Sequence, residues 1–172
     1  MYSKKRVIII CLVILSALLI TGCLPTTTVT TPEKYFTFDS TTGTITDYDV
    51  AGGLDVFIPS TIGGIAVEHI GIDAFLEKYL TSVIIPDSVV SIGPCAFRIN
   101  LLTSVTIGNS VTSISYEVFG SNPLTSVTIG ADVDINSDST TMGTNPGFKT
   151  AYDGGGKLAG TYNYIGGVWV KI

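Results

Sequence analysis

The chain repeats itself every 22 residues, and this repeat restricts its possible folds more than any other feature. The heptapeptide LTSVTIG occurs at Leu102–Gly108 and again at Leu124–Gly130, and a near copy, LTSVIIP, occurs at Leu80–Pro86. Four apolar columns keep the same spacing: Val83, Val105 and Val127; Ile85, Ile107 and Ile129; Ile70, Ile92 and Ile114; Phe75, Phe97 and Phe119. A fixed period of about 20–29 residues predicts a solenoid in which each repeat forms one coil.

The repeat unit also predicts how each coil is built. Its strand reads L-T-S-V-x-I, and we expect Leu102, Val105 and Ile107 to point into the core. A proline or glycine follows each strand and turns the chain, and Val111 and Ile114 then return to the core. Because one coil cannot cover its own apolar face, neighbouring coils must stack. The expected fold is a β-rich solenoid of about three to four short coils forming a parallel sheet.

Both ends of the repeat depart from the pattern in ways that predict caps. The first coil carries extra residues between Ile58 and Ile70, and the last coil runs one residue longer than the others. Strand-like residues within 35–46 predict a hairpin over the first coil. A second hairpin is predicted within 161–172, where Ile165-Gly166-Gly167 supplies the turn and Trp169 covers the core.

The segment IPDSVVSIGPCAF, at Ile85–Phe97, resembles the BspA-like leucine-rich repeats of bacterial surface proteins. The resemblance extends from Leu54 to Tyr152. It implies an exported protein that takes part in attachment or in contacts between proteins.

The N-terminus has the features of an export signal. Lys4-Lys5-Arg6 precedes Val7–Ile20, an uncharged stretch that is too short for the roughly 20 residues of a membrane-spanning helix but fits the ~7–15 of a signal peptide. The following Leu19–Cys23 resembles the lipobox of bacterial lipoproteins. This resemblance implies cleavage before Cys23 and a lipid on its thiol; the alternative is an uncleaved anchor helix.

These features divide the chain into five expected segments. Leu24–Pro32 is rich in Thr and Pro and reads as an extended tether, which would place an exported, membrane-anchored protein at the cell surface or outer membrane. The segments are a lipoprotein signal peptide (1–22), the lipidated cysteine and tether (23–33), an N-terminal cap hairpin (34–53), the solenoid (54–146) and a C-terminal cap hairpin (147–172).

The charge argues against a nucleic-acid partner. The whole chain carries −5, and removal of the three basic residues at the N-terminus leaves six bases against fourteen acids, or 6 − 14 = −8. A phosphate backbone would repel such a surface.

The residue inventory does not favour an enzyme. His69 is the only histidine, and because Ser91 and Ser113 occupy its column in later coils, it reads as a surface substitution and not a general base. No G-x-S-x-G motif is present. Asp153–Lys157 has the glycines of a phosphate-binding loop, but Leu158 follows the lysine, so a turn is expected. We expect no catalytic residues, cofactor or small-molecule substrate.

The best metal candidate is a run of alternating oxygen ligands that resembles the first half of a calcium loop: Asp132, Asp134, Asn136 and Asp138. Ser137 replaces the glycine of such a loop, and Gly143 replaces its final acid. The alternative, which we favour, is a degenerate strand with Val133 and Ile135 inward and no specific calcium.

Cys95 would be the last free thiol if Cys11 leaves with the signal peptide and Cys23 carries lipid. It shares a column with Asp73 and Glu117, which predicts a position near the surface. The two interpretations are an intermolecular disulfide and an incidental replacement, and the second is favoured because nothing nearby in the sequence activates the thiol.

The remaining candidate is the outward side of the strands. Stacked coils would align their hydroxyl-bearing residues into rows, on the kind of surface that solenoids use for binding. The alternative is that threonine occurs there only for its β-propensity and solubility. The residues are Thr81, Ser82, Ile84, Thr103, Ser104, Thr106, Thr125, Ser126 and Thr128. The predicted function is a protein-binding or adhesion module that contacts host-matrix or envelope protein. The alternative is a structural or self-associating envelope lipoprotein without an extracellular ligand.

Overall fold

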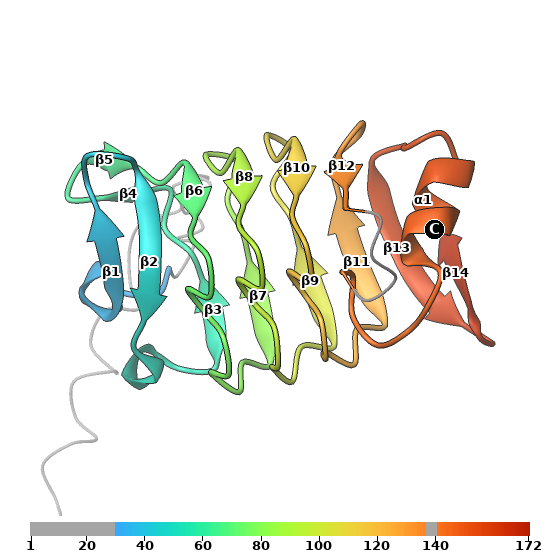
Figure 1. Ribbon diagram of the computed structural model, residues 1–172, viewed down its shortest axis with the longest axis horizontal. Coiled ribbons are helices and arrows are strands. Elements are labelled where there is room, and N and C mark those ends of the chain that lie inside the picture. The colour runs from blue at the N-terminus through green and yellow to red at the C-terminus, as the bar shows by residue number, and fades with distance from the viewer. Residues whose placement is uncertain (1–29, 137–140) are drawn as a thin grey trace, which may run out of the picture.

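The computed structural model describes residues 30–136 and 141–172. Within these ranges the chain winds into a solenoid whose coils lie side by side, from β1 and β2 at one end to α1 and β14 at the other (Figure 1). The expected signal peptide, Cys23, tether residues 24–29 and Asp138 lie outside the described residues. The described residues contain no helix that is both long and apolar enough to cross a membrane.

Each coil contributes one strand to a six-stranded sheet, here called sheet B, with the order β14-β13-β11-β9-β7-β3. The strands β3, β7, β9 and β11 are parallel, whereas β13 and β14 extend the sheet as an antiparallel hairpin. Their bounds are Asp55–Phe57 (β3), Ser82–Ile84 (β7), Ser104–Thr106 (β9), Ser126–Ile129 (β11), Gly160–Ile165 (β13) and Val168–Lys171 (β14). The register sets Val83, Val105 and Val127 side by side, so the 22-residue period of the sequence becomes a step of one strand.

A second six-stranded sheet, here called sheet A, has the order β1-β2-β6-β8-β10-β12. Its first two strands form an antiparallel hairpin, and the other strands are parallel (Figure 1). Their bounds are Phe36–Asp39 (β1), Thr44–Tyr48 (β2), His69–Ile70 (β6), Ser91–Ile92 (β8), Ser113–Ile114 (β10) and Asp134–Ile135 (β12).

The fold class expected from the sequence is therefore confirmed: a β-rich solenoid of 22-residue coils with a hairpin at each end. The sequence pointed to one parallel sheet, and the structure has two. The strands β6, β8, β10 and β12 have two residues each. Such strands are too short to show the alternation by which a strand is recognised, although Ile114 was expected to face the core.

The columns of the sequence become the layers of the core. The Val and Ile columns are buried between the two sheets. The Phe column forms a stack in which Phe97 lies 4.7 Å from Phe75 and 5.4 Å from Phe119 between ring centroids. Tyr48 of the N-terminal hairpin joins the stack at 5.3 Å from Phe75, so this hairpin shares one core with the coils. Offset aromatic contacts of this kind stabilise a core beyond the area that they bury.

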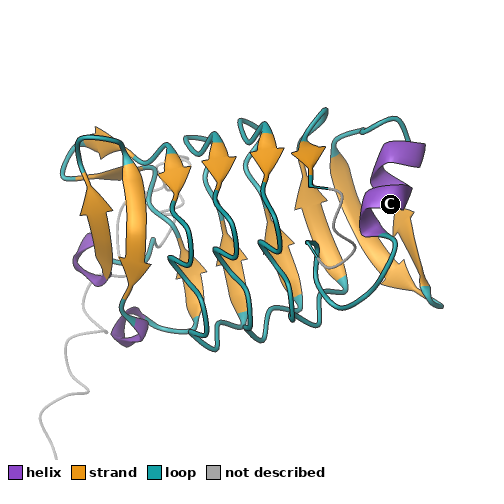
Figure 2. Ribbon diagram, in the orientation of Figure 1, coloured by secondary structure: helices purple, strands orange, loops and turns teal. Residues whose placement is uncertain are grey.

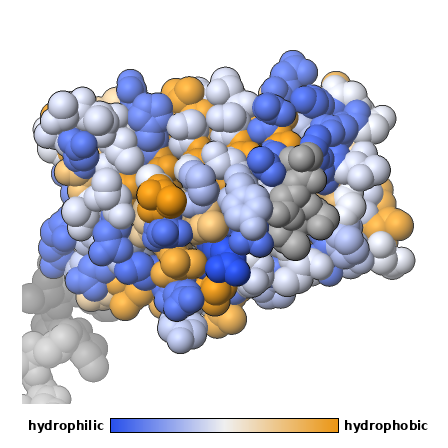
Figure 3. Space-filling model, viewed as in Figure 1, coloured by the Kyte–Doolittle hydropathy of each residue, from blue (hydrophilic) through white to orange (hydrophobic). Residues whose placement is uncertain are grey.

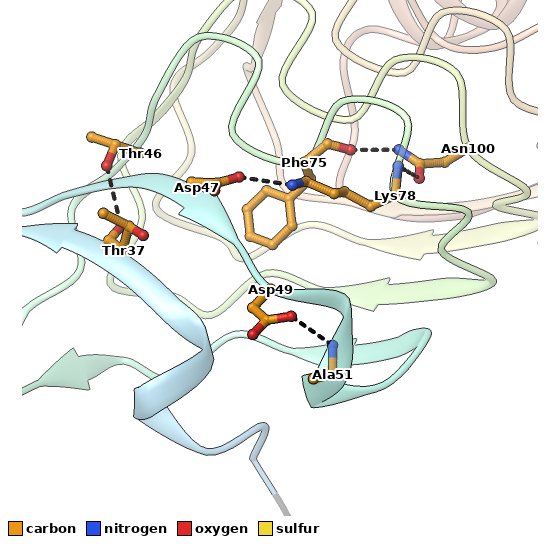
Figure 4. A network of polar contacts seen from close by, with 8 residues as sticks. All are labelled: Thr37, Thr46, Asp47, Asp49, Ala51, Phe75, Lys78 and Asn100. Atoms are coloured by element: carbon orange, nitrogen blue, oxygen red, sulfur yellow. Dashed lines mark hydrogen bonds and ion pairs between the residues drawn. The ribbon is translucent and has the colours of Figure 1, made fainter.

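Buried asparagines tie each coil to the one before it. Asn100 accepts hydrogen bonds from the backbone N–H of Lys78 (3.1 Å) and of Leu80 (3.0 Å), and its amide donates to the carbonyl oxygen of Phe75 (2.8 Å). Figure 4 shows the contacts with Lys78 and Phe75. Asn122 repeats the arrangement one coil later, accepting from Leu102 and donating to Phe97. The sequence showed this column at the end of the repeat unit but not its role.

The remaining elements lie in the lengthened first coil and in the caps. The extra residues of the first coil form a small hairpin, β4 (Thr61–Ile62) with β5 (Ile65–Ala66). Two short 3-10 helices, η1 (Glu33–Tyr35) and η2 (Val50–Gly52), flank the N-terminal hairpin. The α-helix α1 (Phe148–Gly154) lies beside the C-terminal hairpin, whereas strands and loops make up most of the rest of the described chain (Figure 2).

The helix α1 is a correction to the sequence interpretation, which placed a turn at Asp153–Lys157. Asp153 and Gly154 belong to the helix, and only the residues after it turn. Three aromatic residues explain why so short a helix forms here. Phe148 and Tyr152 are buried on one side of it, and Trp169 packs edge-to-face on Phe148 at 5.0 Å between ring centroids. Tertiary packing stabilises this helix more than its glycine-containing sequence does.

Candidate functional site

The outward side of sheet B brings the nine predicted residues together. Alternation along each strand turns Val105 into the core and leaves Ser104 and Thr106 exposed. The register aligns the outward residues in two rows, one through Ser82, Ser104 and Ser126 and the other through Ile84, Thr106 and Thr128. Thr81, Thr103 and Thr125 precede the three strands and are also exposed. We call this surface, with its nine residues, the hydroxyl face.

The hydroxyl groups at the β7 end of this face already have partners. The carboxylate of Asp55 accepts hydrogen bonds from the hydroxyls of Thr81 (2.7 Å) and Ser82 (2.8 Å). These two bonds hold the pKa of Asp55 below its ordinary value, because they favour the charged carboxylate. This end of the face is therefore an internal network.

The middle of the face is different. Thr103, Ser104 and Thr106 are exposed, and among the described residues nothing bonds to their hydroxyl groups. On the neighbouring coil, two hydroxyl groups have partners within the chain. The hydroxyl of Thr125 donates to the carbonyl oxygen of Thr103, and the hydroxyls of Thr128 and Thr161 bond at 2.9 Å. Each hydroxyl group on β9 can both donate and accept a hydrogen bond. The face thus presents unused polar groups at its centre on a scaffold fixed by two sheets.

Sheet B extends beyond the residues that the sequence identified. At one end β3 adds Asp55 and Phe57, which pair with Ser82 and Ile84. At the other end Asn163 pairs with Ser126, and Thr161 pairs with Thr128. The V-x-I pattern of Val56 and Ile58 could have indicated β3, but the longer first coil shifts it out of the 22-residue register. The strand β13 runs antiparallel, so it has no place in the repeat.

On the outward side of sheet B, exposed apolar side chains lie toward both ends and hydroxyl groups lie in the middle. The exposed fractions are 38% for Phe57 and 40% for Ile84 at one end, and 42% for Val170 at the other. Between them the outward positions carry Ser, Thr and Asn. A polar centre with apolar flanks is the reverse of the usual protein interface, which has an apolar core and a polar rim.

Apart from Phe57 on β3, the exposed aromatic residues lie on the segments that connect the strands. Tyr79 has the largest exposed fraction of them, 68%, and Tyr116 lies on the next-but-one coil. The side of the molecule seen in Figure 3 shows apolar side chains interspersed with polar and charged ones. That pattern gives no single apolar patch on this side.

The other sequence candidates occupy separate places. His69 lies in sheet A, where its Nδ1 is 2.8 Å from the hydroxyl oxygen of Ser91, the residue that follows it in the column. The column of Asp73, Cys95 and Glu117 lies on the connecting segments, and all three residues have left-handed backbone with φ of 56°, 56° and 48°. This repeated conformation, which is unusual for residues other than glycine, had no signal in the sequence.

The thiol of Cys95 is half-buried and free. Burial is the main cause that raises its pKa, and the nearby carboxylates of Asp73 and Glu117 raise it further. Since the thiolate is the reactive form, this environment makes Cys95 a poor nucleophile at neutral pH.

The calcium candidate has the strand alternation that was offered as its alternative. Val133 and Ile135 are buried, whereas Asp132, Asp134 and Asn136 are exposed. Within residues 30–136 and 141–172, no group of three or more His, Cys, Asp and Glu side chains is placed to hold a metal ion. Because Asp138 lies outside the described residues, weak or absent calcium binding stays a prediction.

A short-coiled solenoid of parallel strands with an open sheet face defines a leucine-rich repeat protein, a class that commonly binds other proteins. Residues 66–144 match the family model described as "BspA type Leucine rich repeat region (6 copies)". Residues 66–144 are therefore a BspA-type leucine-rich repeat region, and the chain is a leucine-rich repeat protein.

Two solved structures are similar to the chain. A leucine-rich repeat protein from Bacteroides capillosus ATCC 29799 is 31% identical, with a TM-score of 0.50, and the match covers 56% of this chain and 78% of that one. The T. pallidum leucine-rich repeat protein TpLRR is 24% identical, with a TM-score of 0.46, and the match covers 62% of this chain and 64% of that one. A comparison with curated proteins finds no match. None of these matches indicates an enzyme family.

Proposed function

We propose that the chain is a bacterial surface lipoprotein whose hydroxyl face binds a protein of the host matrix. The single observation that carries the binding role is the row of unpartnered hydroxyl groups on β9, at the centre of a rigid exposed sheet. The membership of the leucine-rich repeat family supports it, because solenoids of this kind commonly present a sheet face to their partners.

The expected ligand is a protein with its own exposed donors and acceptors. Serine and threonine hydroxyls bond equally well to backbone and side-chain groups, but they supply little apolar contact area. The face also lacks the Trp, Tyr and Arg side chains that carry most of the energy of tight interfaces. We therefore expect weak binding to each molecule, made effective by many copies on one cell.

The lipid anchor is supported by the sequence alone. The basic residues, the short apolar stretch and Cys23 together form the signal described above. In cells grown with a labelled fatty acid, the Cys23→Ser variant should take up no label, whereas the unchanged chain should be labelled. Cys11→Ser is the matched control, because this cysteine lies inside the apolar stretch and should leave the labelling unchanged. An unchanged chain that takes up no label but stays in the membrane fraction would support the uncleaved helix instead.

The binding role depends on which side of the membrane the solenoid faces. Protease added to intact cells should remove the solenoid if it lies outside, with a cytosolic protein as the control for lysis. The purified chain, immobilised on a sensor surface, should then retain a solubilised basement-membrane matrix. If the solenoid resists protease on intact cells and retains only envelope material, the role is that of a structural envelope lipoprotein.

A further inference from the structure

We infer that two copies of this chain pair through β14, in the same plane as sheet B, and so form a two-fold symmetric dimer. The inference is independent of the ligand proposed for the hydroxyl face. It rests on the hydrogen-bonding direction of β14, on the side chains that flank it and on the contrast with the other strand edges.

The backbone of β14 has one bonded side and one open side. The N–H of Ile172 donates to the carbonyl oxygen of Thr161, and Asn163 pairs with Val170. In an antiparallel ladder the residues that bond to the neighbouring strand alternate, so Val168, Val170 and Ile172 bond toward β13. The backbone groups of Trp169 and Lys171 therefore point away from the sheet. In the part of the chain that the structure describes, no further strand pairs with β14.

The side chains flanking this open edge are apolar. Val168, Val170 and Ile172 lie on the outward side of sheet B, with exposed fractions of 59%, 42% and 70%. An exposed regular strand with apolar side chains is a template for pairing with another chain, and proteins normally interrupt or charge such edges. The charged side chain on β14 is Lys171.

Two other strand edges, those of β3 and β1, are protected. At the opposite edge of sheet B, the backbone N–H of Thr31 donates to the carbonyl oxygen of Phe57 (2.9 Å), and the N–H of Phe57 donates to the hydroxyl of Thr31 (3.0 Å). In sheet A, β1 is broken by an irregularity between Thr37 and Phe38 and turns Thr37 and Asp39 to solvent. A head-to-tail chain of copies through β3 is thus disfavoured, which favours the pairing of β14 with the β14 of a second copy.

One register of this pairing is self-complementary. If Trp169 of each copy exchanges backbone hydrogen bonds with Lys171 of the other, Val170 lies opposite Val170 on the two-fold axis. Val168 then lies opposite Ile172 of the second copy, and Lys171 lies opposite Trp169 instead of another lysine. Opposite pairs of this kind stabilise antiparallel strands, whereas like charges destabilise them. The two hydroxyl faces would lie on the same side of one continuous sheet, which suits bivalent binding.

The strand is short, so the interface is smaller than the roughly 1,200–2,000 Å² of stable complexes, and the association should be weak in solution. We therefore choose a covalent trap as the first test. A full-length background with Cys11, Cys23 and Cys95 changed to Ser, purified in detergent, removes the native thiols. The Val170→Cys variant of this background should form a disulfide-linked dimer under mild oxidation, because residues opposite each other in a non-hydrogen-bonded pair have Cα atoms about 4.5 Å apart.

The matched control is Ile84→Cys, whose exposed fraction of 40% is close to the 42% of Val170 but which lies on β7, near the opposite edge of sheet B. The inference predicts that Val170→Cys dimerises at least tenfold faster than Ile84→Cys. Equal rates for the two variants, or no dimer from Val170→Cys, would overturn it.

A second test uses the backbone. Proline at position 171 removes an N–H that points away from the sheet, so the fold should tolerate it while the added strand should not. In the cysteine-free background, Lys171→Pro should raise the dimer dissociation constant at least tenfold by sedimentation in detergent. Lys171→Ala, which keeps the N–H, should raise the dissociation constant no more than about fivefold, as the loss of one pair of opposite side chains implies. Dimers that persist in Lys171→Pro would show association through another surface.

Discussion

Two polar columns repeat along this solenoid, and one is buried whereas the other is exposed. Asn100 and Asn122 are buried, and each bonds to backbone groups of two coils. Ser104 and Thr106 repeat at the same 22-residue spacing but lie on the surface, without a hydroxyl partner among the described residues. Repetition in the sequence therefore does not distinguish a structural residue from an available one; burial does.

The difference follows from the cost of burying polar groups. When a buried amide side chain is removed, the backbone donors and acceptors that it bonded are left without a partner and without water. Each such group costs about 1–3 kcal/mol. An exposed hydroxyl loses nothing when it is removed, because water satisfies whatever it leaves behind. The asparagine column therefore has a structural role between coils. The hydroxyl column tolerates substitution and is available for binding.

The largest expected effect comes from the buried column. Asn100→Ala removes the acceptor of two backbone N–H groups and the donor to buried carbonyl oxygens, so the free energy of unfolding should fall by about 3 kcal/mol or more. Asn109, which is exposed, is the matched control, and Asn109→Ala should change stability by less than about 0.5 kcal/mol. Urea unfolding measures both. A difference of less than 1 kcal/mol, on the order of one unsatisfied group, would contradict the structural role of the column.

A smaller loss of stability is expected when a buried hydroxyl is removed, and none when an exposed hydroxyl is removed. The hydroxyl of Tyr152 donates to the carbonyl oxygen of Gly130 (2.7 Å) and accepts from the N–H of Val133 (3.0 Å). Tyr152→Phe should therefore cost about 1–3 kcal/mol. Thr106→Val removes a hydroxyl from the exposed face and should cost nothing measurable. Thermal unfolding of the two variants tests this, and a larger loss for Thr106→Val would show that its hydroxyl has an internal partner.

The smallest effect concerns the network at the β7 end of the hydroxyl face. The pKa of Asp55 is lowered in the folded state, so the carboxylate stabilises the fold above its ordinary pKa of 3.8 and loses this contribution as the pH falls through the lowered value. The drop in Tm from neutral to acidic pH should be smaller for the Asp55→Asn variant than for the unchanged chain. The change should be slight and should shrink in salt, because Asp55 is exposed. An identical pH profile for the two proteins would show that the network does not form.

The sequence predicted the layers of the fold well, because the apolar columns are strict. The spacing of Val83, Val105 and Val127 gave the strand pairing of sheet B, and the turn at Ile165–Gly167 gave the C-terminal hairpin. The second sheet was missed because its strands, such as Ser91–Ile92, are only two residues long. The helix at Phe148–Gly154 was missed because it depends on contacts with Trp169, which is distant in the sequence.

The candidate site was only partly predictable. The repeat identified the nine residues of the hydroxyl face, since their positions follow directly from the inward columns. The repeat could not show that the hydroxyls of Thr81 and Ser82 donate hydrogen bonds to Asp55. The longer first coil hides the pairing of β3 with β7 from the 22-residue spacing. The conformation of the Cys95 column was also hidden, because a left-handed backbone leaves no trace when the residues are Asp, Cys and Glu.

The central claim is that the hydroxyl face, and not the solenoid as a whole, contacts the partner. The most direct measurement compares Thr106→Lys with Thr112→Lys, two exposed threonines, the first on the hydroxyl face and the second beside sheet A. Each variant, with its fold checked by circular dichroism, is tested for retention of a solubilised basement-membrane matrix against the unchanged chain. The account predicts that Thr106→Lys loses at least tenfold in retention while Thr112→Lys keeps it. Full retention by Thr106→Lys, or an equal loss in both variants, would contradict it.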